Sequence, residues 1–244
     1  MKRWKIKLLY AVGILICLLE IRFHTVQSML DRVAVWRVKS LAQEVHKEYE
    51  TTWLGVEMLQ YPGDLLDYAT IVHRIKPDVI VEAGTYAGGL TTYLAMVLEQ
   101  ANPKGVVVTI DLYSNGWDAL VRSQTFSTSL LQRIVFLQGD SGSREIYEKV
   151  AKYARGKVVM VILDSLHTSS HVYKELNLYS EFVSSGSYLI VNDTREEAMS
   201  LFPGNEGPLA AVRQFLRENQ NFSSDPSFPR NYISCAPMGF LKRL

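Results

Sequence analysis

Acidic side chains recur in this sequence at the ends of apolar segments. The acids of this kind are Glu82, Asp111, Asp140, Asp164 and Asp193. If each apolar segment is a strand of one parallel sheet, these acids gather at the carboxyl edge of the sheet, where open α/β sheets bind their ligands. A single acid in such a place is most often a turn residue or a helix cap. Acids after five successive segments favour a binding site.

Asp164 and the pair Asn192-Asp193 end two apolar segments and carry the most specific signal. Carboxylate and amide oxygens from neighbouring strands suit Mg²⁺, so these three residues are predicted metal ligands. An ion there could hold a substrate hydroxyl and lower its pKa. His167, three residues after Asp164, is placed to take the hydroxyl proton as a general base.

Two other interpretations of these residues stay open. Asp164 could cap a helix that begins near Ser169, which would leave His167 as an ordinary loop residue. Asp164, His167 and His171 also have the spacing D-x-x-H-x-x-x-H, which could form a zinc site. Two carboxylates and an amide on adjacent strands favour the harder ion, Mg²⁺.

A glycine-rich turn, residues 84–89, joins an apolar segment to a helical pattern. Its glycines allow close approach of a ligand to the backbone, and the helix that follows offers free N–H groups. Asp111 ends the next apolar segment and could accept both hydrogen bonds of a ribose diol. That spacing fits NAD as well as S-adenosylmethionine. The turn reads G-x-x-x-G-G, without the G-x-G-x-x-G pyrophosphate fingerprint, which favours S-adenosylmethionine.

Gly139-Asp140-Ser141-Gly142 copies the nucleophile motif of trypsin-like proteases. That chemistry needs a histidine and an aspartate well upstream, on a two-barrel β fold. The surrounding pattern is α/β, so we predict instead that Asp140 and Ser141 end the third strand and touch the adenine of a cofactor.

The elements that must position these residues alternate along the chain. Strands are predicted at 78–82, 106–111, 133–138, 157–163 and 187–192, and helices at 65–74, 90–100, 144–153, 171–182 and 207–218. Continuous apolar strands between helices indicate a parallel sheet covered on both faces. The tail, 222–228 and 232–241, is strand-like without a helix between. We therefore predict an α/β fold: a Rossmann-like doubly wound sheet, mostly parallel, with a C-terminal antiparallel hairpin.

The N-terminus differs in character from the rest of the chain. Residues 1–24 combine Lys and Arg with an apolar run, 8–19, that is short for a membrane span, and no signal-peptide cleavage site follows. A spanning helix with this basic flank would place the remaining chain outside the cytoplasm, away from S-adenosylmethionine. We predict a cytoplasmic protein whose residues 1–24 contact a membrane surface, although packing on protein stays open. Residues 25–50 predict an amphipathic helix, and 51–244 one catalytic domain.

Composition excludes some classes of function. The 244 residues carry a formal net charge of +1, which gives no electrostatic case for nucleic acid. The two cysteines, Cys17 and Cys235, lie too far apart in the sequence for a metal-binding pair and form no disulfide framework, so a reducing compartment is expected.

Several motifs in order resemble the cephalosporin hydroxylase/rhamnosyl O-methyltransferase family, from about Trp53 to the C-terminus. They are WLG at 53–55, PGDL at 62–65, PDVIVEAGT at 77–85, GG at 88–89, LDSLH at 163–167, HVYKEL at 171–176, GSYLIV at 186–191 and GFLKR at 239–243. The resemblance implies a methyltransferase fold, S-adenosylmethionine, Mg²⁺, O-methylation of a sugar or other hydroxyl, and often an oligomer. It places Glu82, Gly84, Gly88 and Asp111 on cofactor positions, and Thr85 lies in the same turn.

The resemblance also places Asp164 and Asp193 on the metal positions. Asn192 departs from the family, which commonly has an acid there, so an uncharged oxygen replaces a carboxylate. No iron-binding triad can be placed, which disfavours oxygenase chemistry. We therefore expect a Mg²⁺-assisted O-methyltransferase acting on a small molecule or a glycolipid, as in lipid biosynthesis. An NAD-linked enzyme on the same sheet, or a catalytically silent binding protein, are the alternatives.

Overall fold

The structure is a computed structural model, which describes residues 29, 32–33, 36–37, 51–195, 207–230 and 233–244. The chain divides into two units, Met1–Glu48 and Tyr49–Leu244. The described residues of the first unit are helical. The segment predicted to touch a membrane, 1–24, lies outside the described residues. In the part of the chain that is described, no helix is both long and apolar enough to cross a membrane.

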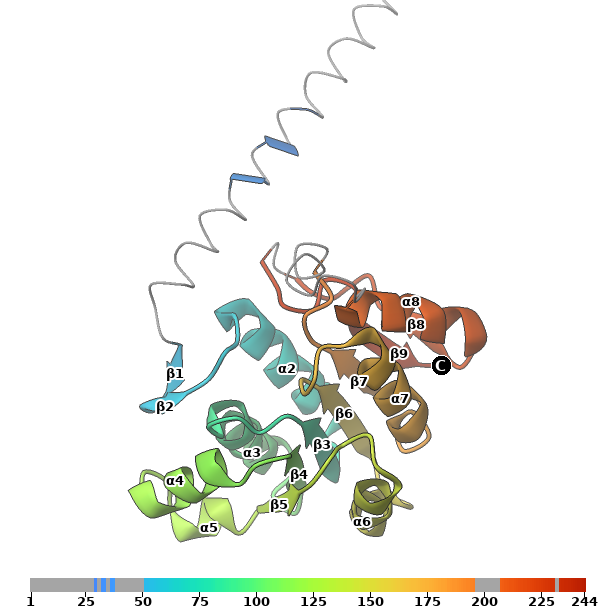
Figure 1. The fold of residues 1–244 in the computed structure, drawn as a ribbon. Helices are drawn as coiled ribbons and strands as arrows, with labels where there is room; N and C mark the ends of the chain where they lie inside the picture. Colours follow the sequence, from blue (N-terminus) through green and yellow to red (C-terminus); the bar gives the residue numbers. More distant parts are fainter. Residues whose placement is uncertain (1–28, 30–31, 34–35, 38–50, 196–206, 231–232) are drawn as a thin grey trace, which may run out of the picture. The chain divides into compact units, whose positions relative to one another are not determined.

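The second unit is built on a seven-stranded sheet (Figure 1). Its strands are β3 (Val79–Ala83), β4 (Val106–Asp111), β5 (Ile134–Gln138), β6 (Val159–Leu163), β7 (Tyr188–Val191), β8 (Phe222–Ser224) and β9 (Phe240–Arg243). The spatial order is β5-β4-β3-β6-β7-β9-β8. Strands β3 to β7 are parallel, whereas β9 is antiparallel to both β7 and β8. The predicted α/β fold with its C-terminal antiparallel hairpin is confirmed.

Helices cover both faces of the sheet (Figure 1). They are α2 (Pro62–Ile75), α3 (Gly89–Ala101), α4 (Asn115–Ser123), α5 (Thr128–Leu131), α6 (Arg144–Ala154), α7 (Ser169–Tyr179) and α8 (Gly207–Glu218). Successive residues of a strand point to opposite faces. In β3, Val79 and Val81 therefore join the core shared with α6, α7 and α8, while Ile80 joins the core shared with α2 and α3.

Some segments differ from the predicted elements. Residues 51–61, for which no helix or strand was predicted, contain a hairpin of β1 (Thr52–Trp53) and β2 (Val56–Glu57), and α2 begins at Pro62 because proline suits the first turn of a helix. The first tail strand ends at Ser224 and not at residue 228. The second tail strand begins at Phe240 and not near residue 232. Pro237 has no N–H to donate to a strand ladder, so pairing with β7 starts only after it.

Strand β3 pairs with β4 on one side and with β6 on the other. The connections from β3 to β4 and β5 therefore run toward one edge of the sheet, whereas β6 and β7 lie toward the other edge. At such a switch point the loops after neighbouring strands diverge and leave a crevice beyond their carboxyl ends, which is where ligands bind in open α/β sheets.

Candidate active site

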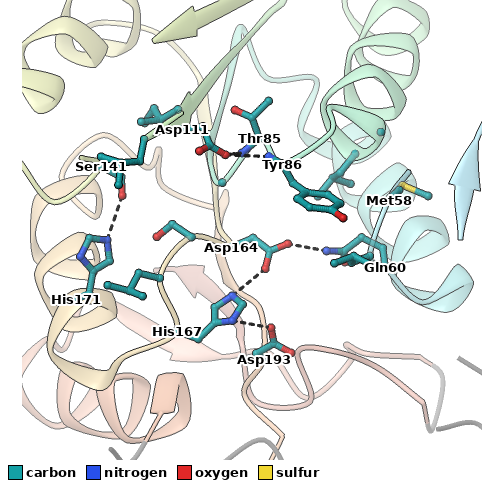
Figure 2. Close-up of a pocket in the computed structure, with 18 of the residues that line it drawn as sticks. Met58, Gln60, Thr85, Tyr86, Asp111, Ser141, Asp164, His167, His171 and Asp193 are labelled. Carbon is teal, nitrogen blue, oxygen red and sulfur yellow. Dashed lines mark hydrogen bonds and ion pairs between the residues drawn. The ribbon is translucent and has the colours of Figure 1, made fainter. Parts of the chain in front are cut away.

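A cavity of about 650 Å³ lies at this edge of the sheet (Figure 2). Its walls come from the segment after β2 and from the loops after β3, β4, β5, β6 and β7. Of the residues predicted for the site, Gly84, Thr85, Asp111, Asp140, Ser141, Asp164, His167 and Asp193 line it. Glu82, Gly88 and Asn192 are not among its lining residues. The sheet thus brings most of the predicted residues together.

Gly84 follows β3 and lies against the backbone of Asp164, which follows β6. Its φ is +99°, a left-handed conformation, and a Cβ atom here would collide with the backbone carbonyl of Asp164. The glycine is therefore required by the approach of Asp164 as well as by the turn. Gly88, at the N-terminus of α3, also has a left-handed φ, +88°.

Asp111 ties the end of β4 to the glycine turn. Its Oδ2 accepts hydrogen bonds from the backbone N–H groups of Thr85 at 3.0 Å and Tyr86 at 2.9 Å, and its Oδ1 accepts from Tyr113 N–H at 3.1 Å. A carboxylate offers about four acceptor sites, so capacity remains for a ligand hydroxyl. The contact predicted with a ribose stays a prediction.

Glu82 faces α3 and not the cavity. Its Oε2 accepts from the hydroxyls of Thr91 at 2.5 Å and Thr109 at 2.6 Å. Its Oε1 is buried and has no hydrogen-bond partner among the described residues. Burial raises the pKa of Glu82 to about 8, against the two threonine hydroxyls, which lower it. The cofactor contact predicted for Glu82 is therefore without support from its own contacts.

Ser141 belongs to a second polar group on the cavity wall. Its hydroxyl donates to Glu175 Oε1 at 2.5 Å and lies 3.1 Å from His171 Nε2. His171 Nε2 is also 3.3 Å from the same glutamate oxygen. A catalytic triad needs serine and acid on different ring nitrogens, so this group is not one. The hydrogen bond to Glu175 raises the pKa of His171.

Asp164, His167 and Asp193 form a separate cluster in the cavity lining (Figure 2). Each offers one ligand atom, and these atoms all lie within 4.8 Å of one another. His167 Nε2 is 3.3 Å from Asp164 Oδ1, and His167 Nδ1 is 3.3 Å from Asp193 Oδ2. The donor set, two carboxylates and an imidazole, fits a divalent cation. His171, a member of the alternative zinc set, is not in this cluster.

The electrostatics of the cluster follow from burial and from its charges. Burial lowers the pKa of His167, but the Asp164 and Asp193 carboxylates outweigh it and hold that pKa above the usual value. Burial raises the pKa of Asp193, and Asp164 adds to the effect by repulsion. Asp193 also has a left-handed φ of +53°, a conformation that costs free energy in residues other than glycine and is frequent at functional sites.

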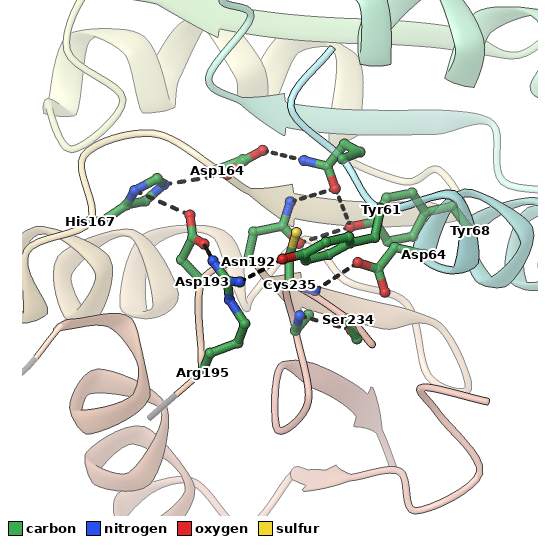
Figure 3. Close-up of polar contacts among 12 residues, drawn as sticks. Tyr61, Asp64, Tyr68, Asp164, His167, Asn192, Asp193, Arg195, Ser234 and Cys235 are labelled. Carbon is green, nitrogen blue, oxygen red and sulfur yellow. Dashed lines mark hydrogen bonds and ion pairs between the residues drawn. The ribbon is translucent and has the colours of Figure 1, made fainter. Parts of the chain in front are cut away.

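A chain of polar side chains lies behind Asp164 (Figure 3). Gln60 Nε2 donates to Asp164 Oδ2 at 2.7 Å. Asn192 Nδ2 donates to Gln60 Oε1 at 3.4 Å, and the Tyr68 hydroxyl donates to Asn192 Oδ1 at 2.8 Å. The amide oxygen of Asn192 that was predicted to bind the metal thus already accepts a hydrogen bond. Coordination by Asn192 stays a prediction.

No sequence pattern predicted a site role for Gln60, Tyr68 or Arg195. Arg195 is 3.4 Å from Asp193 Oδ1 and donates to the Tyr61 hydroxyl at 2.8 Å (Figure 3). Gln60 and Asp164 are separated by 104 positions in the sequence, and no local pattern links them. Arg195 lies two residues after Asp193, which was the available signal.

Comparison with known proteins points to one family. The sequence model of the rhamnosyl O-methyltransferase/CmcI family matches residues 45–244. A rhamnosyl O-methyltransferase of Mycobacterium tuberculosis is 28% identical over 217 residues, which cover 84% of this chain and 85% of that protein. The corresponding protein of Mycobacterium leprae is 27% identical over 207 residues, covering 80% and 85%.

Solved structures share the fold. A CmcI structure described as a Mg-SAM complex superimposes with a TM-score of 0.60 at 21% identity, covering 80% of this chain and 76% of that one. The TDP-rhamnose 3'-O-methyltransferase of calicheamicin biosynthesis gives a TM-score of 0.54 at 19% identity, covering 74% and 78%. TomG of Streptomyces achromogenes, in complex with SAM, gives 0.54 at 15% identity, covering 77% and 80%.

Proposed function

Since the chain belongs to the rhamnosyl O-methyltransferase/CmcI family and is an S-adenosylmethionine-dependent O-methyltransferase, we propose that it methylates a sugar hydroxyl with the help of Mg²⁺. Relatives named for rhamnosyl and TDP-rhamnose substrates support this acceptor class. Family membership removes the NAD-linked alternative. A glycolipid acceptor, contact of residues 1–24 with a membrane surface, and a homo-oligomer remain predictions.

The observation that carries the proposal is a single cavity with two chemically different walls. The glycine turn, Asp111 and the Asp140-Ser141 pair form the wall that suits a nucleoside, with backbone N–H groups and acids for its hydroxyls. Asp164 and Asp193 form the wall that would hold a divalent cation. When bound, S-adenosylmethionine supplies the methyl group and Mg²⁺ lowers the pKa of the acceptor hydroxyl.

His167 is proposed to take the proton of the acceptor hydroxyl. Its Nδ1 is held by Asp193, while Nε2 points toward Asp164. A base oriented by a second group is the arrangement that general-base catalysis requires. Burial lowers the pKa of His167, but the two carboxylates outweigh burial and raise that pKa, which makes the imidazole a stronger base than a free one.

Arg195 supports the geometry of Asp193. Its guanidinium lies beside Asp193 Oδ1 and donates to the Tyr61 hydroxyl. Its positive charge therefore offsets the negative charge of Asp193, whereas the contacts of Asp164 are made by other residues. Positioning of the acceptor oxygen and stabilisation of its developing negative charge account for most of the rate enhancement in this mechanism.

The acceptor class is tested with methyl-labelled S-adenosylmethionine, Mg²⁺ and a panel of acceptors: rhamnosyl glycosides, other hexosides, rhamnosylated lipids and non-sugar alcohols. We expect label in the sugar of a rhamnosyl or related acceptor, identified by mass spectrometry of the released sugar. Transfer only to non-sugar alcohols would reject the proposed acceptor class and leave the O-methyltransferase assignment intact.

A further inference from the structure

We propose that Gln60 is a positioning residue that fixes the Asp164 carboxylate for the cation, and that Asn192 acts through Gln60 and not as a metal ligand. The inference rests on the proposed function, because it concerns the same cation site. It follows from three hydrogen bonds that run in one direction, from Tyr68 through Asn192 and Gln60 to Asp164.

The chain begins at a fixed donor. Tyr68 is fully buried, and its single hydroxyl proton has two acceptors within reach, Asn192 Oδ1 at 2.8 Å and Gln60 Oε1 at 3.2 Å. The shorter contact is with Asn192, so the Asn192 oxygen is occupied. Its Nδ2 is left to donate to Gln60 Oε1. The orientation of the Asn192 amide follows from these two contacts together.

Gln60 can have only one amide orientation in this setting. Its side chain is 2% exposed, so solvent does not substitute for a partner. With Oε1 toward Asn192 Nδ2, the Nε2 group faces Asp164 Oδ2 at 2.7 Å. The flipped amide would place an oxygen against a carboxylate and an N–H against an N–H, and each contact would be repulsive.

This series of hydrogen bonds requires an amide, and not a carboxylate, at position 192. An amide accepts at one atom and donates at the other, so Asn192 passes the hydrogen bond on. An ionised aspartate would accept from Tyr68 but has no proton to donate to Gln60. Hydrogen bonds aligned in series polarise one another and strengthen the terminal donor, here the Gln60 N–H on Asp164.

The terminal bond limits what Asp164 can do. Oδ2 is held by Gln60, so Oδ1 is the oxygen directed at His167 and the cation cluster. The backbone that carries Gln60 is held as well, because α2 follows directly and its fully buried Asp64 accepts from the N–H of Cys235 at 2.7 Å (Figure 3). Groups that orient a metal ligand from outside typically change metal affinity by about 10- to 100-fold.

The test is calorimetric titration of Mg²⁺ into the full chain. Gln60→Leu removes the terminal donor and is expected to weaken Mg²⁺ binding by about tenfold or more. Gln214→Leu is the matched control, since Gln214 is a partly exposed glutamine of α8 whose side chain contacts Glu218 and Tyr173 and is not in the cation cluster, and it should bind Mg²⁺ as the unaltered chain does. Tyr68→Phe removes only the buried hydroxyl that donates to Asn192. We expect this variant to bind Mg²⁺ about two- to fivefold more weakly than the unaltered chain.

Combining substitutions at positions 60 and 192 distinguishes an Asn192 that acts through Gln60 from an Asn192 that binds the metal. If Asn192 acts through Gln60, Asn192→Leu combined with Gln60→Leu binds Mg²⁺ no more weakly than Gln60→Leu alone. A metal ligand at 192 would instead make the two losses multiply, which overturns the proposed role. Equal Mg²⁺ affinity of Gln60→Leu and the unaltered chain would overturn the role of Gln60.

A titration of S-adenosylmethionine distinguishes failure of the roles proposed for Gln60 and Asn192 from failure of the proposed function. The variants should bind S-adenosylmethionine within about twofold of the unaltered chain, because the chain of hydrogen bonds does not reach the glycine turn. If the unaltered chain binds S-adenosylmethionine but not Mg²⁺, both the metal-assisted step and this inference are wrong. If it binds Mg²⁺ with the predicted pattern but not S-adenosylmethionine, the cation site stands and the proposed function falls.

Discussion

His167 is held by both ring nitrogens between two carboxylates, each at 3.3 Å. Replacing it with asparagine keeps a polar side chain but removes the titrating group. We expect the rate of methyl transfer to fall by about 10²- to 10⁴-fold, the usual contribution of a general base. Single-turnover kinetics measure this step.

The affinity for S-adenosylmethionine should stay unchanged in His167→Asn, because His167 is not among the residues proposed to bind the cofactor. His73→Asn, at an exposed position of α2, is the control and should leave the rate unaltered. A His167→Asn enzyme with the full rate would show that another group takes the proton.

Glu82 makes the stability of the fold depend on pH. Its pKa is about 8 in the folded chain, against an ordinary value of 4.5. Between those values the folded state holds a proton that the unfolded state has lost, so the free energy of unfolding falls as pH rises through this window and then levels off. Glu82→Gln, which is neutral at every pH, should remove this fall.

The effect is on the order of a few kcal/mol across the window. Urea denaturation at several pH values between 5 and 9 measures it, and Glu99→Gln, on the partly exposed side of α3, serves as control. The same slope in Glu82→Gln as in the unaltered chain would show that Glu82 is ionised in the fold.

Elements of secondary structure determine where these residues meet. Each of the five predicted parallel strands lies within about two residues of its observed bounds, because a buried parallel strand is a continuous apolar run. The acids at the strand ends then follow from topology, since parallel strands end at one edge. The segment 112–132 gave no helix prediction, because α4 buries only Leu120 and α5 has four residues.

The group behind Asp164 could not be found from the sequence for a different reason. Gln60 reaches Asp164, and Tyr68 reaches Asn192, only because α2 packs against the sheet beside β7 and β9. A glutamine before a helix has no distinguishing pattern of its own. Sequence patterns identify the strand-end ligands, whereas long-range packing brings in the residues that orient them.

The close packing of Gly84 against Asp164 predicts that Gly84→Ala and Gly186→Ala differ in folding stability. Gly84 and Gly186 both have left-handed φ, +99° and +80°, but only a Cβ at Gly84 meets other atoms, the backbone of Asp164 and Ser165. Both alanine variants lose about 1 kcal/mol of folding stability from backbone strain. Gly84→Ala should lose about 1 to 3 kcal/mol more through the collision.

Thermal unfolding of the two glycine variants measures the difference. Gly84→Ala is also expected to lose Mg²⁺ affinity, because the displaced backbone carries the Asp164 side chain. Equal melting temperatures for Gly84→Ala and Gly186→Ala would contradict the close packing of Gly84 against Asp164.

At the scale of the whole molecule, the cavity joins the wall proposed for a nucleoside and the wall proposed for a cation across the switch point of the sheet. The fold and the family follow from residues 45–244. The acceptor is not specified by the sheet, since fold alone does not fix a substrate. The unit Met1–Glu48 carries the sequence prediction of membrane contact, and a truncation before Tyr49 tests it.

For that truncation, flotation with liposomes of anionic lipid is the measurement. The full chain should float with the vesicles and the truncated chain should not, with transfer to a soluble acceptor unchanged in both. Flotation of both chains would place the membrane contact outside residues 1–48.

The most direct test of metal-assisted methyl transfer is the initial rate with labelled S-adenosylmethionine as Mg²⁺ is removed and restored. We predict that EDTA abolishes transfer, that Mg²⁺ restores it in the unaltered chain, and that it does not restore it in Asp164→Asn. Transfer that continues at the same rate in EDTA and in Asp164→Asn would contradict the central claim.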